Sequence, residues 1–255
     1  MVDVDRRRTA ADLGSAVRRR ARILEREAHQ RLLRKPGRVR CPVCGWQGYR
    51  FGPSSKPRRA NRICPACSSS ERYRALGLLL RRIGPVQPGT RLLEVAPIDT
   101  VQRAAVELGY TYASVDLWSP DAQVRADLTK IPFATDSFDV VVCFHVLEHI
   151  IDDREAVREL ARIVRPGGRA MVVVPWDPQR TTTFEVDGAD PADYERLYGQ
   201  SDHVRIYGAD LLERWRGTGV AVTEDLWSER FTPDVHAHAA LTGNDDRFWY
   251  LTDPG

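Results

Sequence analysis

Four of the five cysteines form two pairs with the same spacing, and this spacing is typical of a metal site. Cys41 and Cys44 make the first pair, and Cys64 and Cys67 make the second after 19 intervening residues. A two-residue gap lets both thiolates of a pair point into one tetrahedron about 2.3 Å from a zinc ion. Four thiolates leave no open position, so the sequence predicts a structural zinc ribbon over residues 38–75.

Other uses of these cysteines fit the pattern less well. A redox Cys-x-x-Cys motif would need a thioredoxin-like context and would not explain two matched pairs. Structural disulfides are disfavoured because we expect a cytoplasmic protein. The fifth cysteine, Cys143, falls inside an apolar run and is expected to be an inert core residue.

Histidines able to move protons occur in two places. His145 and His149 are spaced i, i+4, which could mimic a metal site, although local packing is the favoured interpretation. His203 follows Asp202, which could orient its ring, and Tyr207 lies four residues further on. Arg205, between them, could bind an anionic group or pair with a nearby Asp.

Strands and helices that alternate along the chain must position these groups. Short apolar runs predict strands and amphipathic segments predict helices. The predicted strands cover 92–96, 112–116, 123–126, 139–144, 170–174, 220–226 and 247–251, with helices over 100–108, 153–164 and 210–216. This order predicts an α/β fold with a doubly wound, mainly parallel sheet, in which ligands bind beyond the carboxyl ends of the strands.

The chain divides into three predicted parts. Residues 1–37 contain a basic helix over 9–34, residues 38–75 form the zinc ribbon, and residues 76–255 form the α/β domain. A polar insertion at about 177–207 is expected to serve the substrate.

Charge is unevenly distributed although the net charge is only +3. Residues 1–75 hold 20 Lys and Arg against 6 Asp and Glu, while the remaining residues hold 18 against 29. A basic segment can bind nucleic acid, but it can equally pack against the acidic domain or remain solvated. No run approaches the roughly 20 apolar residues of a membrane span, and the charged N-terminus disfavours a secretory signal. We therefore expect a cytoplasmic protein without a membrane partner.

Several motifs together resemble the class I S-adenosylmethionine-dependent methyltransferases. They are Leu92-Leu-Glu-Val-Ala96, Asp116, Asp127-Leu128, Ile131-Pro-Phe133, Ser137-Phe-Asp139, His145-Val-Leu-Glu-His149 and Arg165-Pro-Gly-Gly168. The combination is similar to a type 11-like bacterial group with an N-terminal four-cysteine module, which also has segments like 62–74 and 199–208. The resemblance covers about residues 40–225 and implies a Rossmann-like, seven-stranded sheet.

The resemblance also implies roles for residues at the strand ends. Asp116 would accept the ribose hydroxyls of S-adenosylmethionine, Asp127 the adenine amino group, and Glu94 would lie near the methionyl ammonium. The remaining cofactor contacts are expected from Ala96, Leu117, Leu128, Phe144 and His145. The catalytic candidates are His203, His145, Asp202 and Tyr207.

One turn departs from the family pattern. Most members have Gly-x-Gly after the first strand, whereas this chain has Ala96-Pro97-Ile98. Proline fixes φ and Ile98 adds bulk, so we expect this turn to affect how closely the backbone can approach the cofactor. A small-molecule acceptor is the favoured prediction, with an RNA methyltransferase or a non-catalytic zinc-bearing scaffold as alternatives.

Overall fold

The computed structural model describes residues 37–54, 59–83, 86–241 and 247–252. The helix predicted over 9–34 lies outside these residues. The chain divides into two compact units, Met1–Arg74 with Thr232–Thr242, and Ala75–Phe231 with Gly243–Gly255. Each unit has a β-sheet of its own.

A seven-stranded sheet forms the larger unit, in the order β5-β4-β3-β6-β7-β9-β8. The strands are β3 (Arg91–Val95), β4 (Thr111–Asp116), β5 (Val124–Arg125), β6 (Phe138–Phe144), β7 (Val164–Val173), β8 (Ala221–Leu226) and β9 (Arg247–Thr252). The first five are parallel, and β9 runs antiparallel to both β7 and β8. The predicted mainly parallel, doubly wound sheet is confirmed.

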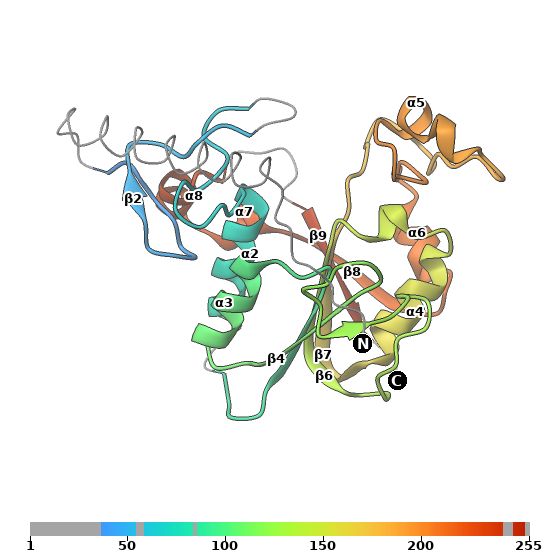
Figure 1. The fold of residues 1–255 in the computed structure, drawn as a ribbon, viewed down its shortest axis with the longest axis horizontal. Helices are drawn as coiled ribbons and strands as arrows, with labels where there is room; N and C mark the ends of the chain where they lie inside the picture. The colour runs from blue at the N-terminus through green and yellow to red at the C-terminus, as the bar shows by residue number, and fades with distance from the viewer. Residues whose placement is uncertain (1–36, 55–58, 84–85, 242–246, 253–255) are drawn as a thin grey trace, which may run out of the picture. The chain divides into compact units, whose positions relative to one another are not determined.

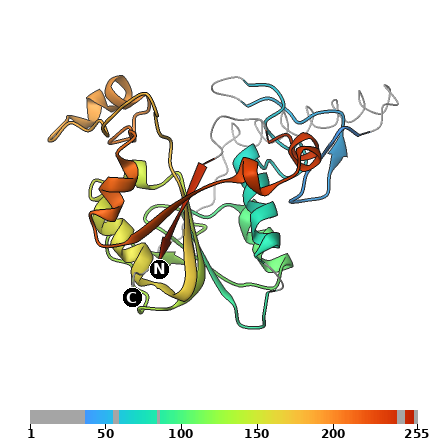
Figure 2. The same cartoon turned by 180° about the vertical axis from the view of Figure 1, so that it is seen from behind.

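Helices cover both faces of this sheet, with α3 (Asp99–Glu107) on one side and α4 (Asp153–Arg162) and α6 (Leu211–Arg216) on the other (Figures 1 and 2). The side chain of Asp152 accepts the Glu155 amide and so caps the start of α4. Short helices complete the unit: η1 (Leu147–His149), η2 (Pro191–Asp193), α5 (Tyr194–Tyr198) and α7 (Trp227–Arg230). No helix in the described part of the chain is long and apolar enough to cross a membrane.

The join between α4 and β7 differs from the sequence prediction. The pattern predicts a helix up to residue 164 that is closed by Pro166-Gly167-Gly168. Instead α4 ends at Arg162 and β7 already begins at Val164. The Pro-Gly-Gly segment is accommodated inside this strand by a register shift opposite Phe138 and Val140.

The cysteine-bearing unit contains a two-stranded sheet, β1 (Val39–Arg40) with β2 (Gln47–Gly48), the start of α2 (Glu71–Arg82), and α8 (Pro233–Ala239). Arg74 joins these parts from a fully buried position. Its Nε donates to the Ala239 carbonyl at 2.6 Å, and its guanidinium lies 3.9 Å from the centre of the Phe51 ring. A C-terminal segment thus completes this unit, and the sequence pattern did not indicate it.

Candidate active site and cysteine cluster

The predicted cofactor residues come together at one edge of the sheet. In the parallel register Val95 lies beside Val115 and Cys143, and Asp116 lies beside Arg125. The carboxyl ends of β3, β4, β5 and β6 therefore meet at a common edge. The predicted cofactor residues lie at or near these strand ends: Glu94, Ala96, Asp116, Leu117, Asp127, Leu128, Phe144 and His145.

The turn after β3 adopts a glycine-like conformation without glycine. Ala96 has φ +54°, in the left-handed region, and its amide donates to the Val115 carbonyl at 3.0 Å. Glu94 holds the other side of the turn, because one carboxylate oxygen accepts the Ile98 amide at 3.1 Å and the other accepts the Tyr112 hydroxyl at 2.6 Å. Burial raises the pKa of Glu94 to about 7.

Asp116 and Asp127 each fold back on the chain that follows them. Asp116 Oδ1 accepts the amides of Trp118 and Ser119, each at 2.6 Å. Asp127 Oδ1 accepts the amide and hydroxyl of Thr129, each at 2.8 Å. No donor among the described residues bonds to Oδ2 of Asp116 or Asp127, so one oxygen of each carboxylate remains for a ligand. Trp118, beside Asp116, is 77% exposed.

Backbone strain marks the end of β6. His145 follows buried Phe144 with φ +58°, which is uncommon for a residue other than glycine. Its amide is held by the Val173 carbonyl at 2.7 Å. Its Nδ1 lies 3.3 Å from Oε1 of Glu148, a buried carboxylate in η1.

His203, near the end of the insertion, lies next to residues of η1. It is buried, and its ring meets that of His149 edge to face with 4.7 Å between centroids. Burial lowers the pKa of His203, which favours the neutral ring. Asp202, expected to orient His203, instead hydrogen-bonds to His149: its carbonyl lies 2.9 Å and its carboxylate 3.4 Å from His149 Nδ1.

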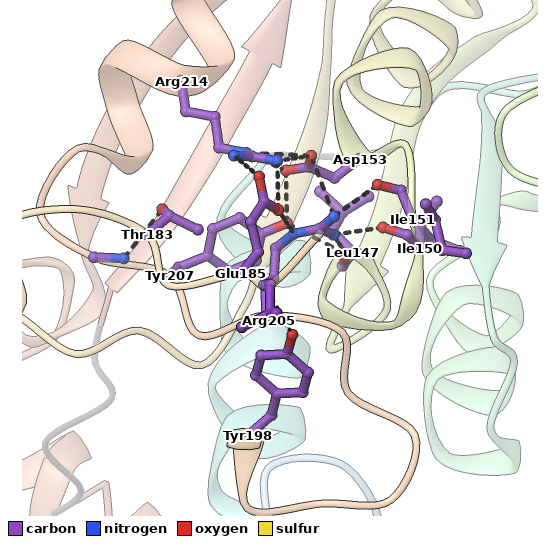
Figure 3. Close-up of polar contacts among 12 residues, drawn as sticks. Leu147, Ile150, Ile151, Asp153, Thr183, Glu185, Tyr198, Arg205, Tyr207 and Arg214 are labelled. Carbon is purple, nitrogen blue, oxygen red and sulfur yellow. Dashed lines mark hydrogen bonds and ion pairs between the residues drawn. The ribbon is translucent and has the colours of Figure 1, made fainter. Parts of the chain in front are cut away.

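A buried ionic network supports this part of the site (Figure 3). Arg205 donates to the backbone carbonyls of Leu147, Ile150 and Ile151, which follow β6 directly. Asp153 is bound by Arg214, at 2.6 Å between Nη2 and Oδ1, and accepts the Tyr207 hydroxyl at 2.9 Å.

These contacts assign supporting positions to two predicted site residues. Arg205 pairs with acidic groups, since its Nε also donates to Glu185 at 3.0 Å. Tyr207 is fully buried and its hydroxyl faces Asp153 and the Leu147 carbonyl. Sequence reasoning missed Asp153, Glu185 and Arg214. The only signal in the sequence was that Arg205 would need an acidic partner, and that partner lies far away along the chain.

The four paired cysteines converge in the smaller unit. Their sulfur atoms all lie within 4.8 Å of one another, and Cys41–Cys67 and Cys44–Cys64 are each separated by 3.7 Å. Four sulfurs about 2.3 Å from a tetrahedral zinc ion would be about 3.8 Å apart. Hydrogen bonds from Cys44, Cys64 and Cys67 lower the pKa of Cys41 well below its usual range.

Both pairs are built on the same backbone turn. In the first, Gly45 donates to the Cys41 carbonyl and Cys41 donates to the Trp46 carbonyl. In the second, Ser68 donates to the Cys64 carbonyl and Cys64 donates to the Ser69 carbonyl. Gly45 and Ser68 both have positive φ, 73° and 62°. The two halves therefore present their thiols in equivalent ways.

Comparison with known proteins agrees with this geometry. Residues 90–172 match a family described as methyltransferase domain. Over 99 residues the chain is 35% identical to demethylmenaquinone methyltransferase of Mycolicibacterium paratuberculosis. This match covers 34% of this chain and 42% of the relative. Over 220 residues it is 28% identical to a protein of Mycolicibacterium smegmatis named probable S-adenosylmethionine-dependent methyltransferase, with 72% of this chain and 86% of the relative covered.

A solved structure supports the fold alone. In the complex between the Haloferax volcanii Trm112 methyltransferase activator and a methyltransferase, one chain superposes with a TM-score of 0.50 at 16% identity, covering 72% of this chain and 92% of that one. The match over β3 to β7 and the carboxylates at the strand ends lead to one conclusion. Residues 90–172 are similar to the methyltransferase domain family.

Proposed function

We propose that this chain is an S-adenosylmethionine-dependent methyltransferase that acts on a small-molecule acceptor. The observation that carries the proposal is the match of residues 90–172 to a methyltransferase domain, with acidic side chains at the carboxyl ends of three adjacent parallel strands. The relatives named demethylmenaquinone methyltransferase favour a small acceptor, although the chain spans only 42% of the length of the first of them.

The strand ends suit the cofactor chemically. The second carboxylate oxygens of Asp116 and Asp127 would accept the ribose hydroxyls and the adenine amino group. Glu94 would lie beside the methionyl ammonium while it holds the turn. Ala96, Leu117, Leu128, Phe144 and His145 would border the ligand. The bound cofactor supplies a methyl group on a sulfonium sulfur.

The acceptor side would be formed by the end of β6 and the insertion 177–207. His145 and His203 are the proposed proton acceptors, since both rings lie close to buried Glu148. Asp202 would act through His149, its hydrogen-bond partner. We propose that Tyr207 positions the insertion, because its hydroxyl is bonded to Asp153 away from solvent.

We also propose that Cys41, Cys44, Cys64 and Cys67 hold a structural zinc ion. The sulfur separations of 3.7 Å support this, because they match the edge of a zinc–thiolate tetrahedron. In this proposal residues 38–75 form the ribbon, residues 1–37 precede it, and residues 76–255 carry the reaction except for Thr232–Thr242, which belong to the cysteine-bearing unit.

Calorimetric titration of the zinc-loaded chain with S-adenosylmethionine and S-adenosylhomocysteine tests the proposed function. We expect micromolar binding of both, lost in Asp116→Ala and retained in Asp234→Ala, a matched change at an exposed position on α8. Binding that is equally strong in Asp116→Ala would refute the assigned ribose contact. No binding of either compound to the wild type would favour the non-catalytic scaffold. Salt-sensitive retention of RNA would favour the RNA methyltransferase.

A further inference from the structure

Three side chains on the acceptor side converge as metal ligands do. Glu148 and His149 belong to η1, directly after β6, and His203 comes from the end of the insertion. One ligand atom from each, a carboxylate oxygen or a ring nitrogen, lies within 4.8 Å of the others. We call this group the Glu-His-His cluster. It is separate from the cysteine cluster, which belongs to the smaller unit.

Glu148 is a buried carboxylate that is only half satisfied. Its side chain is 1% exposed. Oε1 lies 3.3 Å from His145 Nδ1 and 3.9 Å from His149 Nε2. Oε2 is buried and has no hydrogen-bond partner among the described residues. Leaving a buried polar oxygen unpaired is costly, and a cation bound by both carboxylate oxygens of Glu148 would remove that cost.

The backbone selects the tautomer of His149. Its Nδ1 lies 2.9 Å from the Asp202 carbonyl oxygen, which can only accept a hydrogen bond. Nδ1 must therefore carry the proton, which leaves the lone pair on Nε2, the nitrogen that faces Glu148. A ring whose second nitrogen donates to a carbonyl is the usual arrangement of metal-binding histidines.

Hydrogen bonds to the backbone of η1 and its neighbours hold the Glu-His-His cluster in place. The Val204 amide, next to His203, donates to the Glu148 carbonyl at 2.9 Å. Arg205 then binds the carbonyl of Leu147, at the start of η1, and that of Ile151, just after it, and the buried Asp153 network fixes that segment (Figure 3). These bonds join the insertion to η1, so His203 is brought to Glu148 and His149 by the fold itself.

We propose that Glu148, His149 and His203 bind a divalent first-row transition-metal cation. Two imidazoles and one carboxylate suit such ions, and three protein ligands leave coordination positions open. The 3.9 Å between Glu148 Oε1 and His149 Nε2 is close to the roughly 3.4 Å between ligands about 2.1 Å from a tetrahedral ion. This inference rests on the proposed function: an open position would hold an oxygen atom of the methyl acceptor. His145, which is not part of the cluster, would then be the proton acceptor in place of His203.

Mn²⁺ is the probe that separates this site from the cysteines. It favours carboxylate and other oxygen ligands over thiolates, so the zinc-loaded chain can be titrated without filling the cysteine cluster. The six-line paramagnetic resonance signal of free Mn²⁺ decreases as the ion binds. We expect about one Mn²⁺ per chain. Glu148→Gln and His203→Ala each change a direct ligand, so each should weaken Mn²⁺ binding by more than about tenfold, the smallest effect typical of losing only a hydrogen-bond partner of a metal ligand.

Two further variants keep the test decisive. His149→Gln changes a ligand that is 30% exposed, so the fold should survive if the buried variants do not. His238→Ala is the matched control, since His238 is an exposed histidine on α8. No Mn²⁺ binding by the wild type, or unchanged binding in His149→Gln, would overturn the metal site.

A parallel calorimetric titration with S-adenosylhomocysteine distinguishes the two proposals. Cofactor binding without Mn²⁺ binding would remove only the metal site. Mn²⁺ binding without cofactor binding would remove only the methyltransferase function and would leave a metal-binding protein.

Discussion

The hydroxyl of Tyr207 donates to Asp153 Oδ2 at 2.9 Å, and both side chains are buried. Tyr207 ends the insertion and Asp153 begins α4, so this bond ties the insertion to a helix of the core. Trp215 Nε1 lies 3.2 Å from the same oxygen, and Arg214 completes the shell around Asp153. Asp153 is thereby the centre to which the acceptor side of the domain is anchored.

Tyr207→Phe should affect stability and leave the cofactor site intact. Removing the hydroxyl deletes a buried hydrogen bond to a charged group, so the free energy of unfolding should fall by about 2 kcal/mol. Urea denaturation measures this loss, and calorimetry should show unchanged affinity for S-adenosylhomocysteine. Tyr194→Phe, on α5 in the insertion, is the control and should change stability little. Wild-type stability in Tyr207→Phe would show that the bond contributes nothing.

Asp153→Asn should be far more damaging. It removes the buried carboxylate from Arg214 and Arg205 and leaves them only the partly exposed Glu185 as an acidic partner, at a cost of about 3–5 kcal/mol. Asp193→Asn makes the same change in an exposed pair with Arg196 and should cost less than about 1 kcal/mol. Thermal and urea unfolding of both variants provide the measurement. Equal losses in the two variants would contradict the anchoring role of Asp153.

Periodicity predicted the sheet well because each strand carries its own signal. Residues 139–144 are apolar and β-branched, as a strand buried on both faces requires, and β6 covers Phe138–Phe144. The cysteine spacing was equally local: a two-residue gap brings each pair together, although only the fold brings the two pairs to one point.

Long-range contacts were beyond the reach of the sequence pattern. Arg74 bonds to Ala239 and Ala240, which are separated from it by 165 and 166 positions, and no local motif signals that pairing. Likewise Asp202 is next to His203 in sequence, yet the carbonyl and the carboxylate of Asp202 both face the ring of His149. Adjacency in sequence therefore does not show which side chains interact, because tertiary packing determines those contacts.

The left-handed Ala96 should be improved by glycine. An L-residue with φ +54° is strained by about 1 kcal/mol relative to glycine, which lacks the clashing Cβ. Ala96→Gly should therefore raise the free energy of unfolding by about that amount and leave cofactor affinity equal or higher. Denaturation and calorimetry on one protein preparation measure both. Ala113→Gly, a change within strand β4, should instead destabilise. A destabilised Ala96→Gly would mean that the turn gains more from the methyl group than it loses in strain.

Glu94 should make the larger unit less stable as pH rises. Burial raises its pKa from 4.5 to about 7, so the folded state holds this proton more tightly than the unfolded state does. Its contribution to stability is therefore complete below pH 4.5 and is lost as pH rises through 7, a change of about 3 kcal/mol. Glu94→Gln has no proton to lose, so the difference in stability between variant and wild type should shift in favour of the variant between pH 5 and pH 8. Urea denaturation at both pH values tests this, and a difference independent of pH would contradict the assignment.

Zinc should be held by the full set of four paired cysteines and not by Cys143. Structural zinc binding contributes roughly 10–16 kcal/mol in small thiolate sites, and one missing thiolate opens the tetrahedron to water and chelators. The wild type should retain about one zinc ion per chain after dialysis against a mild chelator, whereas Cys64→Ser should lose it. Cys143→Ala, a change in β6 of the other unit, should retain zinc as the wild type does. Metal analysis by mass spectrometry decides between these outcomes. Zinc retained by Cys64→Ser would show that the convergence of the four sulfurs is not a metal site, and its loss from Cys143→Ala would place the ion elsewhere in the chain.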